Sequence, residues 1–231
     1  MPKHTHDLDA MLEAITPETR LVAICNPNNP TGTSLSQEAI DRFIERLPDH
    51  VVAIFDEAYF EMMTEADQPD VLKYIRQGKK NIMVLRTFSK AYGLAGLRIG
   101  YAIADPELIN HLNKIRQPFN VNAMAQAAAM AALDDENHLQ KTREMVFEGL
   151  AFFEKELGAM GIETVPSSAN FILARTGSGR ELFLALQKQK VIVRPMDPYG
   201  LGDFIRITVG TPEQNQRVVD ALKAVLKNGN R

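Results

Sequence analysis

The residues best suited to chemistry lie in one stretch, TFSKAYGLAGLRIGY at residues 87–101. Lys90 closely follows the apolar run IMVL, and a lysine at the end of a buried strand loses hydration, so that its pKa falls and its amine becomes nucleophilic. Thr87, Ser89 and Arg98 offer two hydroxyl groups and a cationic fork, which are the groups that bind a phosphate. A nucleophilic lysine beside a phosphate site is suited to binding pyridoxal phosphate as a Schiff base. Taken alone, however, a Ser-Lys pair more often marks a strand that ends in a solvated lysine.

Three short apolar runs provide the elements that could position such a site. They lie at residues 21–24, 51–55 and 82–85. Helix-like stretches separate them, and this alternation predicts an α/β fold with a mostly parallel sheet. In such sheets ligands bind outside the carboxyl ends of the strands. The polar segments that follow the three runs are therefore expected at one edge of the sheet.

Two of these polar segments lie upstream of Lys90. They are CNPNNPTG at residues 25–32 and DEAY at residues 56–59. Alone, N-P-T-G is a common turn and D-E-A a common helix start. Together and in this order they are strong evidence for a site, because Asn29, Asp56 and Lys90 would then converge at the sheet edge.

With these segments the chain resembles the fold-type I pyridoxal-phosphate aminotransferases, and within them the histidinol-phosphate aminotransferase family. The resemblance runs from about residue 6 to residue 226 and includes the segment VIVRPMDPYGLGDFIRITVGT. The segment QPFNVN breaks the sequence pattern near residue 117, which predicts part of a large cofactor-binding domain at residues 1–117 and a smaller α+β domain at residues 118–231. The resemblance also implies that roughly the first third of such an enzyme is absent from this sequence.

Position by position, the resemblance implies roles for nine residues. Lys90 is expected to be the Schiff-base lysine and the catalytic base. The other expected cofactor ligands are Asp56 at the pyridine nitrogen, Asn29 and Tyr59 at the ring hydroxyl, and Thr87, Ser89 and Arg98 at the phosphate. Arg206 is expected to bind the substrate carboxylate, and Arg194 to join it in binding a substrate phosphate. Each of these two arginines could instead be a solvated strand residue.

The activity implied by the resemblance is transamination between glutamate or 2-oxoglutarate and histidinol phosphate, a step of histidine biosynthesis in a cytoplasmic homodimer. Three alternatives remain. One is an aromatic amino acid aminotransferase, and another is a threonine-phosphate-type decarboxylase of the same fold, which would break the Cα–carboxylate bond. The third is an inactive fragment that only pairs with another chain.

Composition narrows the possible partners. The net charge is −3 and no basic stripe is present, which disfavours nucleic acid. The single cysteine, Cys25, excludes an internal disulfide, fits a reducing cytoplasm and is interpreted as strand-end packing. No metal site is expected, because His4 and His6 are interpreted as part of a solvated tail. No apolar run reaches membrane-spanning length, and the first residues lack a signal-peptide core, so no membrane partner is expected.

Helical patterns and a strand-rich module complete the expected architecture. Helices are predicted at residues 7–14, 36–47, 69–77, 105–114, 122–133, 135–160, 179–189 and 212–227. The Ala/Met-rich segment at 122–133 is interpreted as a closely packed helix. Strands are predicted over ANFILA, VIVRP and FIRITVG in the carboxy-terminal half.

Overall fold

The computed structural model describes residues 4–229 and divides the chain into two compact units. The first holds the described residues up to Asn28 together with Ser34–Gln140. The second holds Asn29–Thr33 together with the described residues from Lys141 onward. Compactness is a different property from independent folding, so the division into domains at residues 1–117 and 118–231 stays a prediction.

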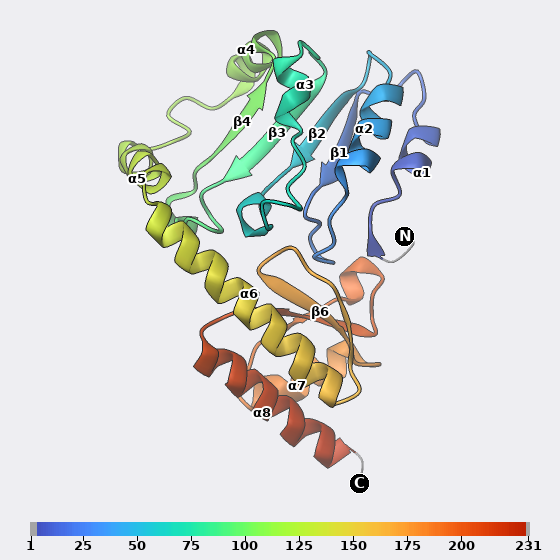
Figure 1. The fold of residues 1–231 in the computed structure, drawn as a ribbon, viewed down its shortest axis with the longest axis vertical. Coiled ribbons are helices and arrows are strands. Elements are labelled where there is room, and N and C mark those ends of the chain that lie inside the picture. The colour runs from blue at the N-terminus through green and yellow to red at the C-terminus, as the bar shows by residue number, and fades with distance from the viewer. Residues whose placement is uncertain (1–3, 230–231) are drawn as a thin grey trace. The chain divides into compact units, whose positions relative to one another are not determined.

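A four-stranded sheet in the order β1-β2-β3-β4 forms the centre of the first unit (Figure 1). The strands β1 (Leu21–Cys25), β2 (Val52–Asp56) and β3 (Ile82–Thr87) are parallel, which confirms the predicted sheet. The fourth strand, β4 (Gly100–Ala104), is antiparallel to β3 and was not predicted. A parallel return needs a long crossover, usually a helix. The segment 88–99 contains only the 3₁₀ turn η3 (Ala95–Leu97), so the chain returns antiparallel.

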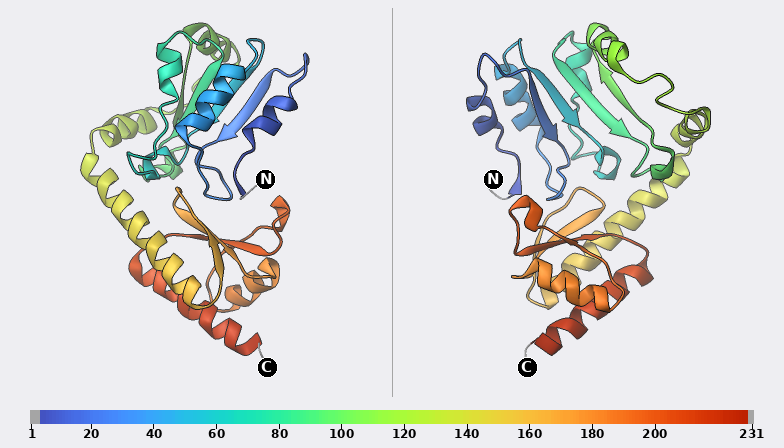
Figure 2. Two further views of the ribbon diagram at one scale, coloured as in Figure 1. Left: turned by 45° about the vertical axis from the view of Figure 1, so that its right-hand side comes forward. Right: turned by 180° about the vertical axis from the view of Figure 1, so that it is seen from behind.

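Three helices cover one face of this sheet, and Figure 2 shows the opposite face from behind. They are α1 (Leu8–Glu13), α2 (Gln37–Arg46) and α3 (Leu72–Arg76). Beneath them the rings of Phe43 and Phe55 meet edge to face with centroids 6.5 Å apart. Both rings are fully buried, and such burial stabilises a fold by about 1.5–3 kcal/mol for each side chain.

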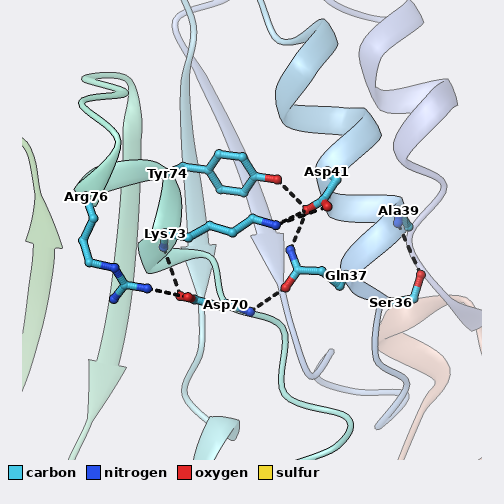
Figure 3. Close-up of polar contacts among 8 residues, drawn as sticks. All are labelled: Ser36, Gln37, Ala39, Asp41, Asp70, Lys73, Tyr74 and Arg76. Atoms are coloured by element: carbon cyan, nitrogen blue, oxygen red, sulfur yellow. Dashed lines mark hydrogen bonds and ion pairs between the residues drawn. The ribbon is translucent and has the colours of Figure 1, made fainter.

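Helix α2 is joined to α3 by a polar network centred on Asp41 (Figure 3). Its carboxylate accepts hydrogen bonds from Lys73 Nζ at 2.9 Å, from the Tyr74 hydroxyl and from the Gln37 amide. The Gln37 carbonyl in turn accepts the Asp70 N–H at 2.7 Å. Burial raises the pKa of Asp41, but these hydrogen bonds outweigh it and leave the pKa below its usual value. The ionised carboxylate therefore holds the two helices together.

We expect Asp41→Asn to lower the free energy of unfolding by about 1 kcal/mol at pH 7, because it removes a charged acceptor from a partly exposed site. Since the pKa of Asp41 is lowered in the folded state, this contribution is present above about pH 4 and fades as the pH falls further. Urea denaturation at several pH values measures it. The exposed Asp49→Asn is the matched control, and an equal loss in both variants would contradict the role of the network.

The first unit continues beyond β4 in two helices and the start of a third. They are α4 (Pro106–Ile115), α5 (Ala123–Leu133) and α6 (Glu136–Ala159). The expectation that the Ala/Met-rich helix is closely packed is wrong within this chain. Only Ala125 and Ala129 of α5 are buried, while Met124 and Met130 are more than two-thirds exposed.

An antiparallel sheet in the order β5-β6-β8-β7 forms the second unit, together with most of α6 and two further helices. The elements are β5 (Glu163–Val165), β6 (Phe171–Arg175), α7 (Gly179–Lys188), β7 (Arg194–Pro195), β8 (Phe204–Thr208) and α8 (Pro212–Gly229). The predicted strand VIVRP is only two residues long. Proline lacks an N–H and is confined to sheet edges, which fits the edge position of β7. The predicted helices are all present, with ends that differ by a few residues.

Candidate functional site

The register of the parallel strands brings their carboxyl ends to one edge. Cys25 lies opposite Asp56, and Asp56 lies opposite Leu85. Backbone hydrogen bonds continue past the strands, because the Asn26 N–H donates to the Asp56 carbonyl and the Glu57 N–H donates to the Leu85 carbonyl, both at 2.9 Å. The residues that follow the three strands therefore start from a shared, hydrogen-bonded edge.

A pocket of about 410 Å³ lies at this edge of the first unit. Its lining residues are Asp56, Ala58, Leu85, Arg86, Thr87, Ser89, Lys90, Ala95 and Arg98. Its volume falls in the range of small-molecule sites, about 300–1,000 Å³. Five of the predicted site residues thus meet in one cavity, with a carboxylate, an amine, two hydroxyls and a guanidinium.

The loop from residue 87 to residue 99 shapes one side of this pocket. Phe88 donates its N–H to the Ile99 carbonyl at 3.2 Å, and Leu94 donates to the Phe88 carbonyl at 2.8 Å, which closes the loop on itself. The Thr87 hydroxyl accepts the Ser89 N–H at 3.1 Å. These bonds hold the two hydroxyl side chains next to each other.

Arg98 ends the loop in a strained conformation. Its φ of +54° is left-handed, which costs an L-residue roughly 1–2 kcal/mol. The guanidinium Nη1 donates to the Ala95 carbonyl at 2.6 Å, so the side chain folds back toward the pocket that it lines. Such strain is concentrated at functional sites.

Asp56 lines the pocket from the end of β2, whereas Tyr59 is not among its lining residues. One carboxylate oxygen of Asp56 accepts the Ala58 N–H at 3.1 Å. Tyr59 is buried, and the Lys90 ammonium lies 5.1 Å from the centre of its ring. Burial and the nearby charge of Asp56 both raise the pKa of the Cys25 thiol, so Cys25 stays protonated and fits its interpretation as strand-end packing.

The second unit contains Asn29, which the sequence had placed with Asp56 and Lys90. The Asn29 side-chain oxygen accepts a hydrogen bond from Arg206 Nη1. The Asn29–Thr33 segment is fixed to this unit by the Ser168 N–H, which donates to the Gly32 carbonyl at 2.8 Å. The structure therefore brings Asn29 together with Arg206, and its convergence with the pocket residues stays a prediction.

Arg194 and Arg206 lie opposite each other on β7 and β8 and line a second cavity of about 530 Å³. Like charges directly opposite in a sheet are destabilising, so this pair favours a bound anion. The Arg206 guanidinium also lies 4.7 Å from the centre of the Phe171 ring, and its buried Nε has no hydrogen-bond partner in the described part of the chain. A third arginine of this cavity, Arg180, is instead paired with Asp197 at 2.6 Å.

Sequence reasoning missed Arg86, which lines the first pocket, and its ion-pair partner Glu57. Arg86 Nε and Nη2 donate to Glu57 Oε2 at 2.9 Å and 2.8 Å. Burial raises the pKa of Glu57 to about 7, although Arg86 opposes the rise. The available signal was a charged residue at the end of an apolar run (IMVLRT) and a second acid in DEAY, each next to a predicted site residue.

As the pH rises from 4.5 to 7, we expect the free energy of unfolding of the wild type to fall by about 3 kcal/mol more than that of Glu57→Gln. The sign follows because the folded state keeps the proton of Glu57 in this window while the unfolded state has lost it, so rising pH favours unfolding. Above about pH 8, where Glu57 is ionised in both states, the difference should be constant. Chemical denaturation across this range measures it, with the exposed Glu45→Gln as control. Parallel curves for wild type and Glu57→Gln would contradict the raised pKa.

The expectations about histidines, metals and membranes have separate outcomes. The interpretation of His6 as a solvated tail residue is wrong. The imidazole is partly buried, and burial lowers its pKa, although the hydrogen bonds that it makes to the Cys25 backbone and to the Asn28 side chain act to raise it. Across residues 4–229 no group of three or more His, Cys, Asp or Glu side chains could hold a metal ion. Over the same residues, no helix is both long and apolar enough to cross a membrane.

Comparison with known sequences gives consistent matches over nearly the whole chain. The profile of the family described as aminotransferase class I and II matches residues 1–222. A histidinol-phosphate aminotransferase of Akkermansia muciniphila is 50% identical over 222 residues, which are 96% of this chain and 60% of that protein. The histidinol-phosphate aminotransferase of Moorella thermoacetica is 49% identical over 96% of this chain and 58% of its own length. The chain therefore spans about three-fifths of the length of these relatives.

Solved structures give the same result for the fold. The histidinol-phosphate aminotransferase of Sinorhizobium meliloti, solved in complex with pyridoxal-5'-phosphate, matches with a TM-score of 0.88 and 30% identity over 97% of this chain and 62% of that one. An L-threonine-O-3-phosphate decarboxylase of Porphyromonas gingivalis matches with a TM-score of 0.79 and 29% identity over 93% of this chain and 67% of that one. The predicted fold class is confirmed by these neighbours.

Proposed function

The chain belongs to the aminotransferase class I and II family, and we propose that it carries out pyridoxal-phosphate-dependent transamination between glutamate or 2-oxoglutarate and histidinol phosphate, in histidine biosynthesis. The observation that carries the proposal is the single pocket that gathers Lys90 with Asp56, Thr87, Ser89 and Arg98. Relatives named histidinol-phosphate aminotransferase, at 49% and 50% identity, support the choice of substrate.

The pocket residues fit the cofactor, since they include groups for both of its charged ends. When bound, pyridoxal phosphate supplies a ring that absorbs the electron pair left as a Cα–H bond breaks. Thr87, Ser89 and Arg98 would hold the phosphate by charge-assisted hydrogen bonds. The Asp56 carboxylate would keep a proton on the ring nitrogen, and Lys90 would hold the cofactor and then carry a proton at its ε-amine.

The second cavity would select the substrate. Arg206 is always charged and offers a planar fork, so it can bind a carboxylate through two hydrogen bonds. Histidinol phosphate lacks an α-carboxylate and carries a tetrahedral phosphate instead, which two arginines serve better than one. Arg194 lies opposite Arg206 in the sheet and is the proposed second cation. Asn29 and Tyr59 are proposed as hydrogen-bond partners of the ring hydroxyl.

Borohydride reduction in the presence of pyridoxal phosphate should attach the cofactor to Lys90, because this amine lies in the pocket that holds the phosphate ligands. Peptide mapping by mass spectrometry identifies the modified lysine. Lys90→Arg should abolish the adduct, whereas Lys80→Arg, at an exposed position, should leave it unchanged. An adduct located mainly on Lys79 or Lys80 would overturn the assignment.

Arg194→Ala should weaken binding of histidinol phosphate by about 1.5–3 kcal/mol, the contribution of a hydrogen bond to a charged group, and leave binding of phenylalanine unchanged. Arg206→Lys should weaken both ligands, since a lysine lacks the planar fork. Titration calorimetry with each ligand measures the two effects. Equal losses for both ligands in the Arg194 variant would favour an aromatic amino acid aminotransferase.

A decarboxylase of threonine phosphate is the second candidate, because the Porphyromonas gingivalis enzyme shares this fold at 29% identity. The two reactions break different bonds at the same carbon. Incubation with threonine phosphate and with histidinol phosphate plus 2-oxoglutarate separates them. Carbon dioxide is released only by the decarboxylase, and glutamate forms only in transamination. Failure of the chain to retain pyridoxal phosphate would instead favour an inactive fragment.

A homodimer in the cytoplasm is also part of the proposal. The single cysteine suits a reducing compartment such as the cytoplasm. A biosynthetic enzyme such as the histidinol-phosphate aminotransferase relatives also fits that location. Exposed apolar side chains gather over one stretch of the first unit, and they are Ile115, Phe119, Met124, Met130 and Leu133. Large exposed apolar surfaces mark protein–protein contacts. A second copy of the chain is the occupant that the family resemblance implies.

A further inference from the structure

The buried ion pair between Glu57 and Arg86 borders the first pocket, which Arg86 lines, and the proposed reaction makes no use of the pair. The Glu57 side chain is 1% exposed and that of Arg86 is 16% exposed. Arg86 also lies with its guanidinium 3.8 Å from the centre of the Phe60 ring. An ion pair buried this deeply is costly to maintain, because both charges have left water. Its presence beside a functional pocket therefore requires an explanation.

The contacts of the Glu57 carboxylate are unequal. Both nitrogens of Arg86 donate to the same oxygen, Oε2. The other oxygen, Oε1, is buried and has no hydrogen-bond partner within residues 4–229. A carboxylate oxygen without a donor loses its hydration without replacement, which favours the protonated acid. Only half of this carboxylate is therefore stabilised as an anion.

Four further titratable side chains act on the ion pair from neighbouring segments of the chain. Glu61, on the 3₁₀ turn η2 (Phe60–Met62), is buried, and its charge raises the pKa of Glu57. Asp70, in the segment before α3, acts in the same direction. Tyr101 on β4 and Tyr92 in the 87–99 loop have raised pKa values, chiefly through burial, and stay neutral. Arg86 is the cation of this cluster, and Glu57 and Glu61 both act to raise its pKa, against burial.

The pair connects the strand ends that carry pocket residues. Glu57 follows Asp56 at the end of β2, and Arg86 precedes Thr87 at the end of β3. Arg86 itself lines the pocket. Asp56 and Thr87, the chain neighbours of the pair, line the same pocket. Because each is covalently joined to a member of the pair, a shift of Glu57 or Arg86 must move a side chain that lines the pocket.

We propose that Glu57 and Arg86 are positioning residues for the pocket, and that a proton held on Glu57 keeps the ends of β2 and β3 closed. Loss of this proton leaves a buried carboxylate whose Oε1 has no donor within the described residues, and it loosens both strand ends. The consequence for pyridoxal phosphate rests on the proposed function. The effect on the strand ends does not, because it follows from the buried pair alone.

Hydrogen–deuterium exchange of peptides that cover residues 52–60 and 82–90 tests the proposal without a ligand. In the wild type the protection factors of these peptides, corrected for intrinsic exchange, should fall about thirtyfold from pH 5.5 to pH 8.5. This factor follows if the pKa of Glu57 is about 7 while the strand ends are closed and 4.5 once they have opened. Glu57→Gln should remove this step, and the exposed Glu45→Gln should retain it. Arg86→Gln should move the midpoint to higher pH, because the cation of this cluster is lost.

A second experiment measures the affinity for pyridoxal phosphate at pH 6 and pH 8.5 from the visible absorbance of the bound cofactor. The wild type should lose more affinity over this range than Glu57→Gln. A Glu57-dependent exchange step without any cofactor binding would support the positioning pair and overturn the proposed function. Cofactor binding with the same exchange step in wild type and Glu57→Gln would overturn the positioning pair and leave the proposed function intact.

Discussion

The parallel pairing of β1, β2 and β3 is the constraint on which the first pocket depends. Its register sets Cys25, Asp56 and Leu85 side by side, so residues more than fifty positions apart in the chain end at one edge. The strict alternation of side chains along each strand then sends neighbouring residues to opposite faces. Asp56 can therefore face a ligand while Glu57, one residue later, is buried in an ion pair. A slip of one residue would exchange these two roles.

Much of this fold could be predicted because the strand signal is local. The runs LVAI, VVAIF and IMVL are apolar, short and separated by helical patterns, which is enough to predict parallel strands. The strand β4 was missed because GYAIA follows a glycine-rich loop and its pairing with β3 depends on how that loop closes. The shortened β7 shows the opposite error. Its β-branched residues favour a strand, but residues 191–193 lie outside the ladder, and only Arg194 and Pro195 pair with β8.

The sequence predicted the pocket residues that lie at or just after the end of a strand. It did not predict residues whose role depends on how deeply they are buried. Lys90, Thr87 and Ser89 are placed by their distance from the end of β3. The importance of Glu57 depends on its exposure of 1%, which no local pattern encodes. Asn29 is a third kind of case. Its position in the chain follows β1, yet its side chain binds Arg206, some 177 residues later, and only the tertiary fold reveals such a contact.

The way each arginine is neutralised indicates where anions can bind. Arg86 is held by the buried Glu57 and Arg180 by Asp197, so both guanidiniums are engaged by acidic side chains within the protein. Arg206 is held by a neutral amide and an aromatic face, contacts that orient a guanidinium without removing its charge. With Arg194 opposite, the positive potential of the second cavity is left for a ligand. The acids thus engage Arg86 and Arg180 within the fold, whereas the neutral partners of Arg206 leave its charge available to an anion.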